Sequence, residues 1–329
     1  TGASNTAVGT FALDANTTAS NNTAVGYSAL TTSTTGSENT GLGHNALYGT
    51  TTGAGNTGIG QGALQTNTTG ATNTAVGQGS LGLNTTGASN VAVGKNALAA
   101  NTTAQENVAV GKDAGLRATT GGFNVCLGPA AGSQLTTGDS NVCIGRLSGS
   151  HNYYLSTGIN NVLIGALSDT TAADTDNANG IGYDIYAEGG YTTVGNSTSD
   201  IRAAHGTATW ATVSDQRYKK DIVDSTAGLS FINALQPRTF KYKTLGELPE
   251  TFSAYEADST EVFKNSDTNH GFIAQEIKAA IDADSSIADG FKLWDDREDG
   301  SQEVAEAALI PILVKAIQEL TARITTLEG

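Results

Sequence analysis

The residues best able to do chemistry gather in one short stretch, two thirds of the way along the chain. Arg217, Lys219 and Lys220 follow directly behind the hydroxyl of Ser214 and the carboxylate of Asp215. The contrast with the preceding chain is sharp, because the first 200 residues contain four Lys or Arg. Taken alone, such a run is most simply a solvated turn at a domain boundary. A serine becomes nucleophilic where a neighbouring group takes its proton, and a desolvated lysine can be that group.

The overall composition excludes several classes of function. The chain has 329 residues, a net charge of −15 and 6% aromatic residues, which argues against nucleic-acid or anionic-membrane binding. No apolar run is long enough to span a bilayer, and no signal peptide opens the chain. The sequence begins inside a repeat and has no Met, so we expect a fragment or a processed product. No cofactor and no metal site is expected.

A repeat of 17 residues fills the first half of the chain. Its core, "NTAVG" or a variant, ends at nine glycines that are 17 residues apart, from Gly9 to Gly145. A tenth core, "NVLIG", ends at Gly165 after a step of 20 residues. Seventeen residues are too few for a helical repeat, whereas alternating Thr and Val with an N-T-T-G turn suit short strands. We therefore expect one coil of strand, bend, short strand and turn per repeat, with the Asn residues stacked in hydrogen-bonded ladders.

Each coil offers a thin apolar core. In the first repeat, Val8, Ala12 and Leu13 are its expected members. Three chains wrapped together would bury more apolar surface and cover exposed edges. The sequence therefore favours a trimeric β-roll or β-prism over a monomeric solenoid. Residues 1–165 resemble the head repeats of trimeric autotransporter adhesins and the shaft repeats of phage tail fibres.

The repeat changes towards its end. The "AL" pair becomes "AG" at Gly115 and Gly132, which predicts a changed cross-section, and "HNYY" then breaks the period. Cys126 and Cys143 occupy one slot of two consecutive repeats, so we expect small buried side chains rather than a disulfide or a metal site. The segment that follows contains tyrosines and carboxylates, which suit a glycan platform or simply pack where the rod changes shape. The tyrosines are Tyr153, Tyr154, Tyr183, Tyr186 and Tyr191.

The last third has an ordinary α+β composition. We expect a helix within residues 225–237, strands at 238–243 and 291–296, and a strand leading into a helix over 270–282. The chain ends in an a/d seam, with Pro311 in the first helical turn. Its members are Ile310, Leu313, Ile317, Leu320, Ile324 and Leu327.

Four motifs in this region carry a second resemblance. "SDQRYKKDI", "LSFINALQPRTFKYK", "HGFIAQEI" and "LIPILVKAIQELTARITTLE" occur in this order. Together they resemble the C-terminal intramolecular chaperone domain of endosialidases and other phage tail fibres, which trimerises, assists folding of the fibre and cuts itself off. The resemblance divides the chain into a repeat shaft at 1–165, degenerate repeats and a neck at 166–213, and the chaperone at 214–329.

The resemblance also implies roles for the basic stretch. Ser214 would be the nucleophile and Lys219 its base, supported by Asp215, Arg217 and Lys220, with cleavage of the bond between residues 213 and 214 (Val213–Ser214). Residues five apart share no face of a helix or a strand. The pair therefore needs a bent backbone or a lysine from another protomer.

These observations predict a homotrimeric phage tail-fibre protein that is assembled in the host cytoplasm and located in the virion. It would act once on itself as a serine endopeptidase, without turnover. Its partners would be a host-surface glycan or protein receptor and other tail proteins, the latter through a preceding segment. The alternatives are a polysaccharide-degrading tailspike, a fragment of a bacterial trimeric adhesin and, from the Thr ladders, an ice- or mineral-binding solenoid.

Overall fold

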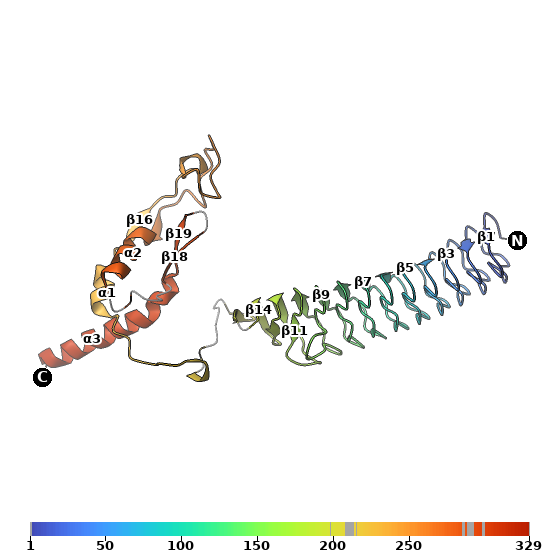
Figure 1. The fold of residues 1–329 in the computed structure, drawn as a ribbon, viewed down its shortest axis with the longest axis horizontal. Coiled ribbons are helices and arrows are strands. Elements are labelled where there is room, and N and C mark those ends of the chain that lie inside the picture. The colour runs from blue at the N-terminus through green and yellow to red at the C-terminus, as the bar shows by residue number, and fades with distance from the viewer. Residues whose placement is uncertain are drawn as a thin grey trace. The chain divides into compact units, whose positions relative to one another are not determined.

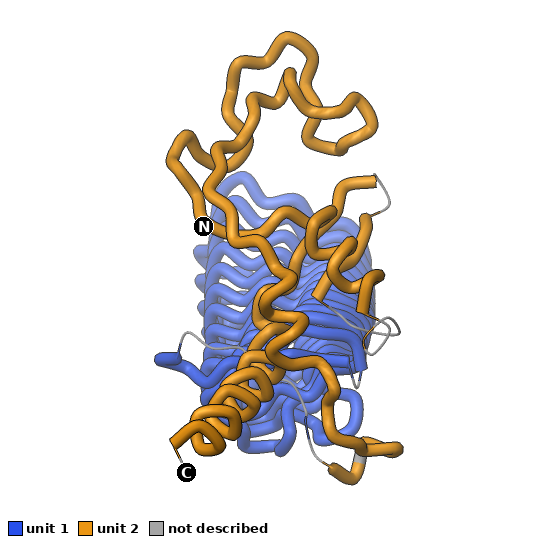
Figure 2. The backbone as a smooth tube through the Cα atoms, turned by 90° about the vertical axis from the view of Figure 1, so that its left-hand side faces the viewer, with its two compact units in different colours: residues 1–215 blue, residues 216–329 orange. Residues whose placement is uncertain are grey.

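The computed structural model describes residues 2–197, 199–207, 214, 216–284, 287, 293–297 and 300–328. The chain forms two compact units, residues 1–215 and residues 216–329, which are coloured separately in Figure 2. Among the described residues, no helix combines the length and the apolar character needed to cross a membrane.

The first unit is a parallel β-solenoid with about 11 turns at a spacing near 17 residues. Figure 1 shows its turns stacked with the strands along one side. The regular turns contribute one strand each: β1 (Thr6–Val8), β2 (Thr23–Val25), β3 (Thr40–Leu42), β4 (Thr57–Ile59), β5 (Thr74–Val76), β6 (Val91–Val93), β7 (Val108–Val110), β8 (Val125–Leu127), β9 (Val142–Ile144) and β10 (Val162–Ile164). Each strand pairs with the next in parallel at the same repeat position, so the predicted solenoid is confirmed.

The last turns of the solenoid are less regular. Their strands are β11 (Asp169–Thr170), β12 (Asn179–Tyr183), β13 (Tyr186–Ala187), β14 (Tyr191–Asn196) and β15 (Ser199–Ala204). β11 and β13 form a separate parallel pair, which is the second strand per turn that the sequence predicted for every repeat. β15 pairs antiparallel with β14 and covers the last edge of the long sheet.

The strands direct their middle residue inwards and their outer two residues outwards. Ala24 at the centre of β2 is fully buried, whereas Val8 at the end of β1 is 57% exposed. The prediction that Val8 belongs to the core was therefore wrong, although Leu13 is buried and Ala12 is partly so. The leucines of the "AL" pairs fill the interior opposite the strands. They leave space for little more than Ala or Gly at the middle position of each strand.

The "AL" segment is a turn rather than the predicted second strand. Its leucines lie at positive φ, with Leu47 at 55° and Leu81 at 50°, and both are fully buried. This left-handed backbone is costly for a branched side chain but directs the leucine into the core. Later turns place glycine there instead: a Cβ on Gly132 would lie 2.5 Å from the Cys126 Sγ. At Gly132 the predicted change of cross-section is thus a transfer of core volume from the turn to the strand, whereas at Gly115 the strand keeps Ala109.

The predicted asparagine ladder runs through the solenoid. From Asn22 to Asn161, each backbone N–H in this column donates to the Oδ1 of the preceding asparagine over 2.9–3.1 Å. The side-chain amides also donate to backbone carbonyls, as Asn39 does to Gly53 over 2.9 Å. Burying these amides is tolerable because their hydrogen bonds are made within the protein.

The second unit is a small α+β structure. Its elements are η1 (Gln216–Tyr218), α1 (Leu229–Ala234), β16 (Arg238–Phe240), η2 (Leu245–Glu247), β17 (Asn269–Gly271), α2 (Ala274–Ala283), β18 (Trp294–Asp296), β19 (Gln302–Val304), η3 (Glu306–Leu309) and α3 (Ile310–Glu328). β16 pairs antiparallel with β17, and β18 with β19. The core gathers Phe231 from α1, Ile277 and Ile281 from α2, and Ile312 from α3. Among the described residues the predicted elements are present, although α1 and β16 are shorter than expected. Residues 291–292 of the strand predicted at 291–296 lie outside the described residues.

Candidate functional site

The basic stretch lies where the two compact units meet in the sequence. Ser214 is exposed, and the short helix η1 follows it. The backbone N–H of Lys219 donates to the carbonyl of Gln216 over 3.0 Å, which closes this turn. The side chains of Arg217, Lys219 and Lys220 are exposed. The backbone is therefore bent over residues 216–219, and the spacing of the serine and the lysine leaves both a bent backbone and a lysine from another protomer open.

Two of the predicted residues, Val213 and Asp215, lie outside the described residues. Ser214 belongs to the first unit and Lys219 to the second. The exposure of Ser214 and Lys219 makes both accessible to another protein surface. Catalysis by a lysine base requires desolvation of the lysine or a nearby cation.

The residues after the basic stretch are held to the last helix. The backbone N–H of Leu229, at the start of α1, donates to Glu319 Oε2 in α3 over 2.9 Å. Gly228 lies directly beneath this carboxylate, since a Cβ there would be 2.5 Å from Glu319 Oε1. Acidic groups favour helix N-termini because backbone N–H groups point outwards there. The chain that leads away from Ser214 is therefore anchored on α3.

Helix α3 has two apolar faces. Ile312 and Ala316 are 4% exposed, and Ile312 packs into the core of its own unit. The predicted seam lies on another face of the helix, and all six of its residues are exposed. They are Ile310 (60%), Leu313 (42%), Ile317 (62%), Leu320 (43%), Ile324 (52%) and Leu327 (85%). A single chain thus leaves a continuous a/d seam uncovered, which is the surface that a parallel coiled coil buries.

The three-residue insertion before β10 forms part of the tyrosine-rich surface. The buried carboxylate of Asp169 accepts hydrogen bonds through Oδ2 from the backbone N–H groups of His151 (3.0 Å), Asn152 (2.7 Å) and Tyr153 (3.0 Å). Asp169 occupies the repeat position of Leu13. Sequence reasoning missed it, although a carboxylate in a leucine column was a signal that a nearby loop needs an acceptor.

The structure brings together two of the five predicted tyrosines. The rings of Tyr153 and Tyr186 lie edge to face with centroids 5.6 Å apart, and the Tyr186 hydroxyl also bonds Asn152. Partial burial raises the pKa of Tyr186, with a further contribution from Asp184. Tyr191 instead lies under Arg202, whose Cζ is 4.8 Å from the ring centroid.

The two remaining tyrosines are on the surface. Tyr154 is 50% exposed and Tyr183 is 51% exposed. The surface around residues 151–154 and 183–186 therefore combines aromatic rings with amide and carboxylate groups, which can stack on sugar rings and hydrogen-bond their hydroxyls.

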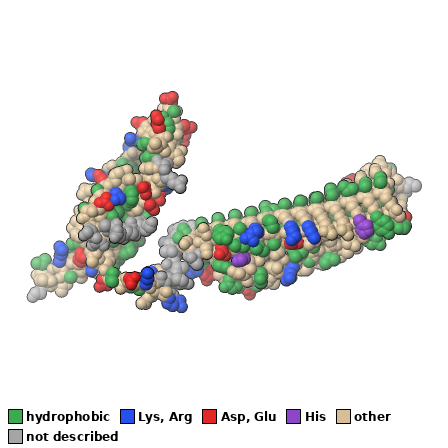
Figure 3. Space-filling view, viewed as in Figure 1, with side chains coloured by type: hydrophobic (Ala, Val, Ile, Leu, Met, Phe, Trp, Pro, Cys, Tyr) green, Lys and Arg blue, Asp and Glu red, His purple; other side chains and the backbone are tan. Residues whose placement is uncertain are grey.

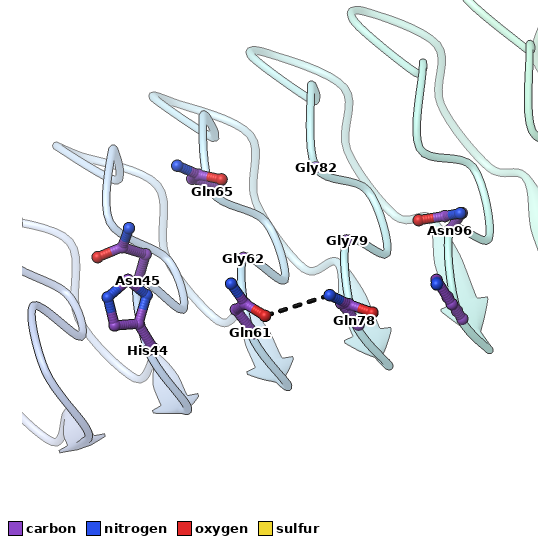
Figure 4. Close-up of a pocket in the computed structure, with 10 residues that line it drawn as sticks. His44, Asn45, Gln61, Gly62, Gln65, Gln78, Gly79, Gly82 and Asn96 are labelled. Carbon is purple, nitrogen blue, oxygen red and sulfur yellow. Dashed lines mark hydrogen bonds between the residues drawn. The ribbon is translucent and has the colours of Figure 1, made fainter.

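A polar groove of about 520 Å³ lies on the early turns of the solenoid (Figure 4). It is lined mainly by the residues that follow the repeat glycine, and Gln78 donates to Gln61 across one turn over 3.2 Å. Gly62 and Gly79 leave space between the amides. Next to it, the ring of Tyr27 stacks on His44 at 5.2 Å. Sequence reasoning missed this groove, and the column of residues after the repeat glycine was the available signal.

The two cysteines are structural. Cys126 and Cys143 are neighbours in the register of β8 and β9, and at most 1% of either is exposed. A hydrogen bond with Cys126, together with complete burial, raises the pKa of the Cys143 thiol well above its ordinary value. A buried neutral thiol is a small apolar side chain rather than a nucleophile, so the prediction for this pair is confirmed.

Comparison with known proteins places the second unit. No curated protein and no solved structure matches the chain. Residues 214–284, however, match a family model, and this match, which contains the first three of the four C-terminal motifs, confirms the resemblance. The match begins at Ser214 and covers α1, β16, β17 and α2. Residues 214–284 are therefore similar to the family described as chaperone of endosialidase.

Proposed function

We propose that this chain is a phage tail-fibre protein whose C-terminal unit trimerises, guides folding of the solenoid and then cuts itself off. The observation that carries the proposal is the family match, which begins at the serine proposed as nucleophile and directly follows a long repeat solenoid. The exposed seam of α3 supports the trimer, because three such helices would bury it.

The need for a chaperone follows from the repeats. Each turn of the solenoid is bordered by turns of nearly the same sequence, so strands can pair one repeat out of register. Parallel pairing over many turns is also slow. Three chains joined at their C-terminal ends would align the last turns first and set the register for the rest. Removal of the guide would then leave a fibre that unfolds slowly and has no simple route to refold.

The proposed cleavage follows from the chemistry of the serine and the lysine. Lys219 accepts the hydroxyl proton of Ser214, and Oγ attacks the carbonyl carbon of Val213. The peptide bond breaks, its nitrogen takes up a proton, and an ester between Val213 and Ser214 Oγ remains. Water hydrolyses this ester and releases residues 214–329. Since Lys219 is exposed in one chain, contact with another protomer would supply the desolvation that makes it a base.

Host attachment is the remaining part of the proposal. The tyrosine surface around Tyr153, Tyr183 and Tyr186 supports recognition of a host-surface glycan, and a protein receptor would be the other partner class. The protein would be part of the virion and would join other tail proteins.

Intact mass spectrometry of the purified chain tests the cleavage. The unaltered chain should yield residues 214–329 as a separate fragment, while Ser214→Ala and Lys219→Ala chains should keep the full mass. Fragment formation by either variant would remove that residue from the proposed chemistry. A single uncut mass for all three chains would mean that the C-terminal unit trimerises and assists folding but does not cut itself off.

A further inference from the structure

The few cations of the solenoid share one position of the repeat. The first 200 residues contain four Lys or Arg, and three of them, Lys95, Lys112 and Arg146, directly follow a repeat glycine. The fourth, Arg117, lies elsewhere in its repeat. The same 200 residues contain eleven Asp or Glu, and none of these follows a repeat glycine. A solenoid of acidic composition thus gathers its cations in one column.

This column lies at the ends of the strands. Because the strands pair in register, its members succeed one another at about 4.8 Å per turn. Six consecutive members are all exposed and extend over about 24 Å. We call them the polar track: Gln61, Gln78, Lys95, Lys112, Pro129 and Arg146. Figure 3 shows Lys and Arg side chains on the broad face of the solenoid, beside the edge with a row of hydrophobic side chains.

The track begins in the polar groove of about 520 Å³. Figure 4 shows Gln61 and Gln78 in a row, and one hydrogen bond of 3.2 Å between them leaves further amide donors and acceptors for a ligand. The residues that follow are Gly62 and Gly79, at φ values of 65° and 68°, so no side chain fills the space beside the amides. Lys95 lines the same groove. The amides therefore lead directly to the cations.

One carboxylate lies beside the track. Asp113 Oδ2 is 3.2 Å from Lys112 Nζ, and Asp113 Oδ1 accepts a hydrogen bond from Asn96 over 3.1 Å. The side chain of Asp113 is 24% exposed, whereas that of Lys112 is 69% exposed. The carboxylate thus holds Lys112 on one side and leaves most of this lysine open to a second anion.

We propose that the polar track binds a linear acidic polysaccharide that lies along the solenoid. The amides of the groove would hydrogen-bond sugar hydroxyls, and the ammonium and guanidinium groups would pair with sugar carboxylates. A column that recurs at every turn suits a polymer, and its step is close to the length of one sugar unit. The track contains no aromatic ring on which bases could stack, which favours a polysaccharide over a single-stranded nucleic acid.

The net charge of −15 acts weakly on such a site. In physiological salt, exposed charges more than about 8 Å apart are largely screened, so the nearest cations decide which polymer binds. The proposal adds a second glycan site to the attachment proposed for the tyrosine surface, and it requires neither the trimer nor the cleavage.

Titration of the purified chain with two forms of one polymer tests recognition of the sugar carboxylate. Oligogalacturonate carries a carboxylate on every sugar, and its methyl ester has the same backbone without the charge. We expect oligogalacturonate to bind about tenfold more tightly than the ester, and added salt to weaken its binding. Absence of binding, or equal binding of the two forms, would overturn the proposal. Equally tight binding of single-stranded DNA would overturn the preference for a sugar.

Variants locate the site. Lys95→Gln and Lys112→Gln should each weaken oligogalacturonate binding about threefold. Arg117→Gln is the matched control, because it removes an exposed cation from the same turn as Lys112 but outside the track. Asp113→Asn should strengthen binding, since it frees Lys112, and a folding defect would not increase affinity. Equal losses for Lys112→Gln and Arg117→Gln would show that net charge alone attracts the polymer.

Tyr153→Ala separates this inference from the proposed attachment. The variant should bind oligogalacturonate as the native chain does. If Tyr153→Ala lost this binding and both lysine variants kept it, the polymer would lie on the tyrosine surface. That result would overturn the track and leave the proposed attachment standing. Loss in the lysine variants alone would support the track whether or not the tyrosine surface binds a host glycan.

Discussion

The backbone N–H of Leu229 donates to the carboxylate of Glu319 across 90 residues of sequence. This bond joins the first turn of α1, which follows the basic stretch, to the middle of α3, whose other face carries the exposed seam. A change in the seam helix can thus reach the start of α1 through one hydrogen bond and the packing of Phe231 against the same core.

Loss of this contact should destabilise the C-terminal unit. Glu319→Ala leaves the N–H of Leu229 without its partner, and we expect a loss of about 1–2 kcal/mol in the free energy of unfolding. Gly228→Ala should cost a similar amount, because its Cβ would displace the carboxylate. Urea titrations followed by tryptophan fluorescence measure both. The double variant should lose little more than either single one, and fully additive losses would show that the residues do not act through this bond.

The leucines of the repeat offer a matched pair. Leu81 is fully buried, whereas Leu83, two residues later in the same turn, is 56% exposed. Leu81→Ala should reduce stability by about 2–5 kcal/mol through lost burial and the cavity left behind. Leu83→Ala should change it by less than about 0.5 kcal/mol. Thermal unfolding followed by circular dichroism compares them, and equal effects would contradict the assignment of the leucine column to the core.

Most of the fold was predictable because the same 17-residue pattern recurs in consecutive repeats. The phase of the 17-residue period gave the parallel register and the asparagine ladder. Alternation did not predict which face of the strand points inwards. In a three-residue strand of Thr, Ala and Val, either the middle residue or the two outer residues could face the core. The sizes of the middle strand residue and of the turn residue indicate that both lie in the core. The middle residue is small where the turn has Leu47, and it becomes Cys126 where the turn has Gly132.

The candidate site was less accessible to sequence reasoning. Spacing alone predicted the seam of α3, because residues in an a/d pattern lie on one face of a helix. The pairing of Ser214 with Lys219 came from the family resemblance, because no local rule joins residues five apart. Asp169 lies in the degenerate turns. Its carboxylate occurs once and not in every repeat, so the repeat pattern did not indicate its hydrogen-bond partners.

The ion pair between Arg238 and Glu276 should make stability depend on pH. The two side chains form two hydrogen bonds, at 2.9 and 2.7 Å, and Arg238 lowers the pKa of Glu276. A carboxyl with a lowered folded pKa contributes stability that is fully present above the unfolded value, about 4.3, and is lost as the pH falls through the folded value. Glu276→Gln should therefore lower the urea midpoint at pH 7 and match the native chain in more acidic solution. Because the pair is exposed, added salt should shrink the difference at pH 7.

The tyrosine surface should carry glycan binding. Tyr153→Ala removes an exposed ring and the edge-to-face partner of Tyr186, and we expect at least a tenfold loss of affinity for host-surface polysaccharide in a pull-down or titration. Tyr27→Ala is the control, since it removes a half-exposed ring from the early turns. Equal losses would place binding elsewhere, and shortening of the polysaccharide by the native chain would favour a degrading tailspike.

Mixed assemblies test whether the lysine comes from another chain. Ser214→Ala and Lys219→Ala chains should each stay uncut when expressed alone. When they are co-expressed, a trimer can contain an intact Ser214 on one chain and an intact Lys219 on its neighbour. If catalysis occurs between chains, cutting should return, and only Lys219→Ala chains should be cut because they retain the serine. Mass spectrometry of differently tagged chains identifies which chain supplied the fragment. No cutting in verified mixed trimers would show that Ser214 and Lys219 must act within one chain.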